Sequence, residues 1–177
     1  MASAVHILNA STIADEQLQE LSRNVAMVFG LRTYVTPEPL NIDPAFDPSR
    51  RQYNSTALLV QLLNSYPNSQ EKKIALVDVD LHVPVLTFVF GEAQLGGIAA
   101  VVSTHRLANQ FYGLPRDDGM MLHRLEKEVI HELGHTFGLY HCRQFECVMR
   151  SSTYVEEIDL KRNTLCSDCT TRLAEIR

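Results

Sequence analysis

Residues 131–142 read HELGHTFGLYHC, and this stretch decides how the rest of the sequence is interpreted. His131 and His135 are four residues apart, so on a helix they share one face, with Cβ atoms roughly 5–6 Å from each other. Two imidazoles at that spacing can bind one metal ion. Glu132 lies about 100° round the helix axis from His131, beside such an ion but not ligating it. The spacing therefore predicts a metal site with a carboxylate next to it.

A third histidine follows the pair at a spacing that a continuous helix cannot use. His141 is six residues after His135 and would point about 120° away from the first two on an unbroken helix. Gly138 stands between them, and glycine readily adopts the positive φ at which helices end. We therefore expect a helix break at Gly138 that brings His141 to the same metal. Three imidazole ligands leave a zinc ion open to water, which is typical of catalytic sites.

The cysteines of the chain all follow this stretch, at Cys142, Cys147, Cys166 and Cys169. In a secreted protein they could pair as disulfides, whereas in a reducing compartment two closely spaced pairs favour metal binding. The histidine cluster beside them favours the metal interpretation.

HELGHTFGLYH matches the pattern H-E-x-x-H-x-x-G-x-x-H, and Met149 and the four cysteines continue it. By these residues the chain resembles the archaemetzincins, a branch of the metzincin metallopeptidases. The resemblance implies that Met149 lies beneath the catalytic zinc and that the cysteines bind a second, structural zinc. It also implies that residues 96–104 form the edge strand above the cleft, to which a peptide adds as an antiparallel strand. Some metzincins place a tyrosine two residues after this methionine; here that position is Ser151.

These assignments predict a zinc-dependent metallopeptidase with two zinc ions per chain. Its substrate would be a peptide or protein. His131, His135 and His141 would hold the catalytic zinc. Glu132 would take a proton from a zinc-bound water and pass it to the leaving amine. The alternative is a zinc-stabilised binding or regulatory protein whose metzincin-like site has little or no peptidase activity. A nucleic-acid zinc ribbon is disfavoured because few basic residues surround the last cysteine pair.

The composition is that of an ordinary globular domain, with 177 residues, 45% hydrophobic and 21% charged. The formal net charge is −5, and no basic cluster is present, so we expect no nucleic-acid and no membrane partner. The first residues lack a signal-peptide pattern, and no apolar run reaches the ~18 residues of a spanning helix. We therefore expect a cytoplasmic monomer.

The remaining sequence predicts an α/β (α+β) fold, with a mixed twisted sheet and helices packed on one face. Strands are expected at residues 5–8, 31–35, 74–81, 85–90 and 96–104. Helices are expected at residues 12–30, from Ser55, and from about residue 120, while residues 36–54 read as a loop. The whole chain, 1–177, is interpreted as one metzincin-like catalytic domain. Its N-terminal lobe would span 1–138, with the sheet and the active-site helix. A small irregular C-terminal lobe, 139–177, would hold Met149 and the structural zinc.

Two other sets of polar residues are interpreted as structural. Asp78 and Asp80 alternate with apolar residues and read as the solvent-facing side of a strand. Histidines without ligand spacing read as surface or structural residues: His6, His82, His105 and His123.

Overall fold

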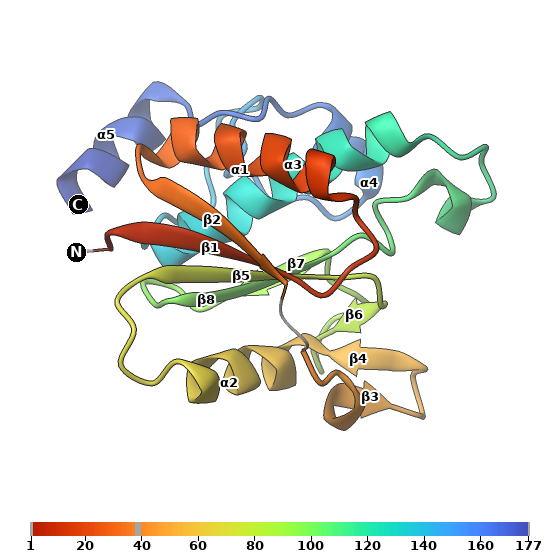
Figure 1. Ribbon diagram of the computed structural model, residues 1–177. Helices are drawn as coiled ribbons and strands as arrows, with labels where there is room; N and C mark the ends of the chain where they lie inside the picture. The colour runs from red at the N-terminus through yellow and green to blue at the C-terminus, as the bar shows by residue number, and fades with distance from the viewer. Residues whose placement is uncertain (1, 38–39, 177) are drawn as a thin grey trace.

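A mixed sheet forms the centre of the protein, and helices cover both of its faces (Figure 1). The computed structural model describes residues 2–37 and 40–176, and in this part of the chain the sheet has five strands in the order β2-β1-β5-β8-β7. Strand β7 runs antiparallel to β8, whereas the neighbours β1, β2, β5 and β8 pair in parallel. The strand bounds are β1 Ala4–Asn9, β2 Arg32–Pro37, β5 Lys72–Val77, β7 Gly91–Ala93 and β8 Ala99–Ser103.

A second, smaller sheet lies below the first in the view of Figure 1. It consists of β3 (Phe46–Asp47), β4 (Gln52–Asn54) and β6 (Leu81–His82), with β4 in the middle. The expectation of a plain loop over residues 36–54 is therefore wrong in its second half, where a short helix, η1 (Asp43–Ala45), precedes a β3–β4 hairpin.

The helices form one layer on each side of the sheet. Helices α1 and α3 cover one face and α2 covers the other (Figure 1). The expectation of helices on one face only is wrong, because β5 and β8 are buried almost throughout and a sheet of this kind must be covered on both sides. Among the described residues, no helix is both long enough and apolar enough to span a membrane. The bounds are α1 Asp15–Phe29, α2 Ser55–Ser65, η2 Asn109–Tyr112, α3 Asp118–Thr136, α4 Val155–Asp159 and α5 Ser167–Ile176.

Apolar stripes on the helices make the two cores. On α1 the buried residues Leu18, Leu21, Val25 and Phe29 recur at helical spacing, and Gly30 ends the helix with φ 58°. They pack with α3 and with the C-terminal segment in one cluster, in which Phe29 stacks on Phe137 at 5.0 Å between ring centroids. The other cluster lies between α2 and the opposite face of the sheet. Burial of each large apolar side chain contributes roughly 1.5–3 kcal/mol, so the α1 cluster firmly supports α3.

Two predictions for the segments beside α3 are also wrong: the strand at residues 85–90, and the edge position of the strand at 96–104. Residues 85–90 form no strand, although Val89 makes an isolated bridge to Leu81; the segment begins in a turn, closed by the Leu86 N–H on the Val83 carbonyl, in which Val85 is 88% exposed. Strand β8, within the predicted 96–104, is not the edge, since it is buried between β5 and β7. The edge beside α3 is the three-residue strand β7.

Candidate active site

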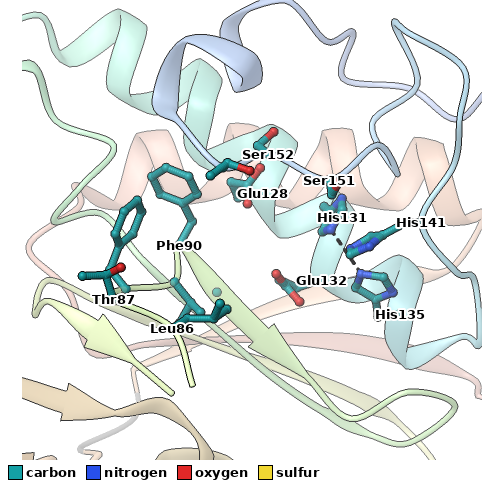
Figure 2. A pocket seen from close by; sticks show the side chains of 14 residues that line it. Leu86, Thr87, Phe90, Glu128, His131, Glu132, His135, His141, Ser151 and Ser152 are labelled. Carbon is teal, nitrogen blue, oxygen red and sulfur yellow. Dashed lines mark hydrogen bonds between the residues drawn. The ribbon is translucent and has the colours of Figure 1, made fainter. Parts of the chain in front are cut away.

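Helix α3 carries the first two histidines and packs against the sheet at β7 and β8. The helix begins at a cap in which the Asp117 carboxylate accepts a hydrogen bond from the Met120 N–H at 2.8 Å. One turn separates His131 from His135 near its C-terminal end, and their Nε2 atoms lie 3.1 Å apart (Figure 2). Helical spacing alone therefore brings two ring nitrogens to one point.

The chain turns sharply after α3 and returns the third histidine to this point. The helix ends at Thr136, and Gly138 has φ 95°, a conformation that favours glycine. The Gly138 and Leu139 N–H groups donate to carbonyls of the last helical turn. The His141 ring then lies 5.3 Å from the His131 ring and 4.9 Å from the His135 ring, between centroids. One nitrogen from each of the three rings lies within 4.8 Å of the others.

Hydrogen bonds fix the tautomers of the two helical histidines. Nδ1 of His131 donates to the Val148 carbonyl at 2.8 Å, and Nδ1 of His135 donates to the Leu139 carbonyl at 2.7 Å. Burial lowers the pKa of His131 well below its usual value and lowers the pKa of His135 and His141. The neutral rings then direct two Nε2 lone pairs at each other, an arrangement that a cation between them stabilises. Zinc–nitrogen bonds of about 2.0–2.1 Å in tetrahedral geometry place ligand nitrogens about 3.3 Å apart, so these residues fit zinc.

Glu132 lies next to the histidines and is buried between α3 and the edge strand. Its side chain points into the cavity beside the rings (Figure 2). Burial raises the pKa of Glu132 well above its usual value, and the nearby carboxylates of Glu128 and Glu92 add to this effect. Gly91 of β7 makes the close approach possible: a Cβ there would lie 2.8 Å from Cγ of Glu132. A carboxylate that readily accepts a proton therefore stands beside the cluster.

The cavity itself has a volume of about 360 Å³. Helix α3 forms its floor, residues 86–91 form one wall, and residues 151–153 form another. Glu128, one turn before Glu132, also lines the floor, and the buried ammonium of Lys161 lies 3.5 Å from its carboxylate. The space beside the three histidines is thus large enough for a small ligand or for part of an extended one.

The four cysteines form a second cluster that follows directly on His141. The Sγ atoms of Cys142 and Cys166 lie 3.7 Å apart, and those of Cys147 and Cys169 lie 3.8 Å apart. These distances exclude disulfides, whose S–S distance is about 2.05 Å. Tetrahedral zinc–sulfur bonds of about 2.3 Å place the sulfurs about 3.8 Å apart. The cluster therefore fits a closed, tetrahedral zinc site, and the four other histidines of the chain belong to neither group.

Met149 joins the two clusters. Its carbonyl accepts a hydrogen bond from the Cys142 N–H at 2.9 Å, and its side chain packs under α3 against Gly134. A Cβ at Gly134 would lie only 2.3 Å from the Met149 Sδ. The segment after the histidine pair is thus tied back to the helix that carries it.

Gly91 and Gly134 were assigned no role from the sequence, although both are needed for these contacts. The position of each glycine within its helix or strand could have indicated that role. A glycine inside a helix weakens it, and a glycine inside a strand leaves a gap, so either one indicates close packing. The partners, Met149 and Glu132, could not be predicted from the glycine positions alone.

Comparison with known proteins places these features in a family. The model of peptidase family M54 matches residues 12–175, which contain the histidine cluster, Glu132 and all four cysteines. The protein is therefore a metallopeptidase.

Relatives and solved structures agree with this match over nearly the whole chain. The archaemetzincin of Methanocaldococcus jannaschii is 35% identical over 175 residues, which are 99% of this chain and 95% of the relative. A crystal structure of a zinc-dependent peptidase from Methanocorpusculum labreanum is similar, with a TM-score of 0.85, 30% identity and coverage of 96% and 99% of the two chains. The archaemetzincin of Archaeoglobus fulgidus, complexed with malonate, has a TM-score of 0.81, 31% identity and coverage of 96% and 99%. The chain belongs to peptidase family M54, the archaemetzincin family.

Proposed function

We propose that the protein hydrolyses peptide bonds in the cavity above α3, with a catalytic zinc held by His131, His135 and His141. We further propose that Cys142, Cys147, Cys166 and Cys169 hold a second, structural zinc. The observation that carries the proposal is the convergence of three imidazole nitrogens within 4.8 Å of one another, beside a buried carboxylate in an accessible cavity. A purely structural site gains nothing from such a carboxylate.

In this mechanism Glu132 moves the proton. Held by His131, His135 and His141, a zinc ion would supply a Lewis acid that polarises the scissile carbonyl and lowers the pKa of water. Glu132 accepts the proton of the attacking water and then donates it to the leaving amine. Burial of Glu132 raises its affinity for that proton. The hydrogen bonds from His131 and His135 to backbone carbonyls hold both rings in one tautomer, as is usual for ligating histidines.

Strand β7 offers the backbone groups that would hold a peptide. The Ser103 N–H donates to the Phe90 carbonyl, and the Gln94 N–H donates to the Ala99 carbonyl. Since backbone groups alternate in an antiparallel pair, those of Gly91 and Ala93 face away from β8. A substrate strand could therefore pair with β7, with Gly91 next to Glu132.

The test is to replace Glu132 with Gln, which keeps the shape of the side chain and removes the base. Peptide hydrolysis should fall by about 10²–10⁴-fold, while zinc content stays that of the wild type. The control is Glu126→Gln, the same change on the same helix, where the carboxylate accepts a hydrogen bond from Asn163 and does not line the cavity. Undiminished hydrolysis in Glu132→Gln would refute the mechanism. A wild-type protein that binds zinc but cleaves no peptide of a broad library would favour the alternative, a zinc-stabilised binding or regulatory protein.

A further inference from the structure

Residues 86–88 are part of the cavity wall that residues 86–91 form. They belong to no strand, so their position depends on contacts with side chains. Nη2 of Arg50 donates to the carbonyls of Leu86 and Thr87, at 2.5 and 3.0 Å. Nε2 of Gln52 donates to the same Thr87 carbonyl at 3.0 Å. The backbone of the wall is therefore anchored to β4 and the turn before it.

A half-buried ion pair extends this anchor. Arg106 binds Asp80 through two nitrogens, with Nε at 2.6 Å from Oδ1 and Nη2 at 2.7 Å from Oδ2. Asp80 Oδ2 also accepts a hydrogen bond from Gln52 at 3.0 Å. Asp80 is therefore not a free solvent-facing residue, and the exposed fractions of the Arg106 and Asp80 side chains are only 19% and 15%. The planar guanidinium fits this paired geometry, which a lysine ammonium cannot reproduce.

The same guanidinium contacts the wall directly. It lies over the ring of Phe88, 4.1 Å from the centroid, and over the ring of Phe111 at 4.5 Å. Phe88 in turn meets Phe90 edge to face at 5.2 Å, and both rings line the cavity. Arg106 is thus connected to the wall twice, at the Phe88 ring and, through Asp80 and Gln52, at the Thr87 carbonyl.

We propose that Arg106 is a positioning residue that determines which substrate side chains the cavity accepts, because it holds the wall formed by residues 86–88. This inference rests on the proposed peptidase function. The zinc ligands come from α3 and the turn after it, which do not belong to this network. Loss of Arg106 therefore leaves the histidines and Glu132 in place but makes the apolar wall mobile. A bulky apolar side chain of the substrate then loses the fixed surface against which it packs.

Three variants separate the contributions. Arg106→Gln removes the charge, the paired hydrogen bonds and the contact over Phe88. Arg106→Lys keeps the charge but not the paired geometry, and Asp80→Asn tests the link to Gln52. The control is Arg116→Gln, which breaks an exposed pair with Asp118 at 2.8 Å outside the cavity. Thermal unfolding and zinc content show which variants are folded and loaded, and Arg106→Lys serves if Arg106→Gln does not fold.

The first measurement is the cleavage profile of a peptide library. KM and kcat are then determined for two peptides, one with leucine and one with alanine at the position that contacts the wall. For Arg106→Gln we expect KM for the leucine peptide to rise about tenfold and kcat to stay within about twofold, so that the preference over alanine is reduced. Arg106→Lys should be intermediate and Arg116→Gln unchanged. Hydrogen exchange over residues 83–90 should be faster in Arg106→Gln.

Two results would overturn the inference. One is faster exchange in the wall with unchanged selectivity, and the other is an equal fall of kcat for both peptides with loss of zinc. Failure of the proposed function is a different result, since the wild-type protein would then cleave nothing. In that case the zinc-loaded proteins are compared by their affinities for peptide hydroxamates that contain either leucine or alanine. If the ratio of the two affinities were the same in Arg106→Gln and in the wild type, the role of Arg106 would be refuted.

Discussion

The histidine cluster and the four-cysteine cluster are adjacent in sequence but differ in their exposure and in the number of ligands that they offer. The histidine rings border a cavity and have a buried carboxylate beside them, and one of the three, His141, is exposed. The four cysteine sulfurs lie within 4.8 Å of one another, and Cys147 and Cys169 are buried among core residues. An incomplete ligand set beside a carboxylate suits chemistry, whereas a complete set of four suits stability.

The backbone between the clusters shows how one depends on the other. His141 and Cys142 are neighbours in the chain, so any constraint on Cys142 also restricts His141. The Cys142 N–H is bonded to the Met149 carbonyl, and Met149 packs under the helix that carries His131 and His135. Substitutions in either cluster can therefore test how far the two depend on each other.

The largest effect is expected from Cys169→Ser, which removes a ligand of the proposed structural zinc. Structural zinc contributes on the order of 10 kcal/mol to the folding of isolated zinc-finger peptides. In this larger domain we expect a loss of several kcal/mol in the free energy of unfolding, measured by denaturant titration together with metal analysis. Removal of the histidine-bound metal by mild chelation should change stability much less. Equal stability losses in the two experiments would contradict the division into a chemical and a structural site.

The next largest effect is expected on catalysis alone, from Gly91→Ala. The new Cβ would lie 2.8 Å from Cγ of Glu132 and 2.7 Å from the Val101 carbonyl, so both the carboxylate and the backbone of β7 beside it must shift. Since a displacement of about 1 Å can cost about 10²-fold in rate, we expect kcat to fall by that amount with both metals retained. Gly97→Ala is the control in the same hairpin, because the three atoms nearest to its Cβ all belong to the exposed Gln94 side chain, which can move away. Normal turnover in Gly91→Ala would contradict the prediction, since it would show that Glu132 can shift without loss of catalysis.

The comparison also shows what could be predicted from sequence. Local spacing was sufficient to place His131 and His135 on one helix face with Glu132 beside them, and the position of Gly138 sufficed to predict the turn toward His141. Long-range pairing could not be predicted in the same way. The apolar run of β8 is compatible with an edge or a central strand until its neighbours are known. Residues 85–90 have strand-forming residues but contact strands only at their end, where Val89 bridges Leu81 and the Phe90 carbonyl accepts a hydrogen bond from the Ser103 N–H. Arg106 contacts the cavity wall through tertiary structure only, so no local pattern indicated it.

A smaller effect, on metal binding, is expected from Gly134→Ala. Its Cβ would overlap the Met149 Sδ at 2.3 Å, and Met149 is fully buried, so the methionine or the helix that carries His131 and His135 must shift. We expect the affinity for the catalytic zinc to fall about tenfold, as measured by competition with a chromophoric chelator. Gly119→Ala on the same helix is the matched control, because the nearest atom to its Cβ is the Asp117 Oδ1 at 3.4 Å. There alanine should leave zinc affinity unchanged and stabilise the helix by about 0.5–1 kcal/mol. Equal zinc affinities in both variants would rule out a supporting role for Met149.

The smallest expected effect tests the coupling of the clusters most directly, through two changes that each remove one thiolate. Cys142→Ser and Cys166→Ser both leave three sulfurs, and both residues are partly exposed. They differ in that Cys142 adjoins His141 and is bonded to the Met149 carbonyl, whereas Cys166 lies beyond α4 in the chain. If the cysteine cluster positions His141, catalytic zinc affinity should fall several-fold more in Cys142→Ser than in Cys166→Ser, at similar losses of stability. Equal affinities would mean that the turn at Gly138 places His141 without help from the second metal, and the two clusters would then be neighbours without being coupled.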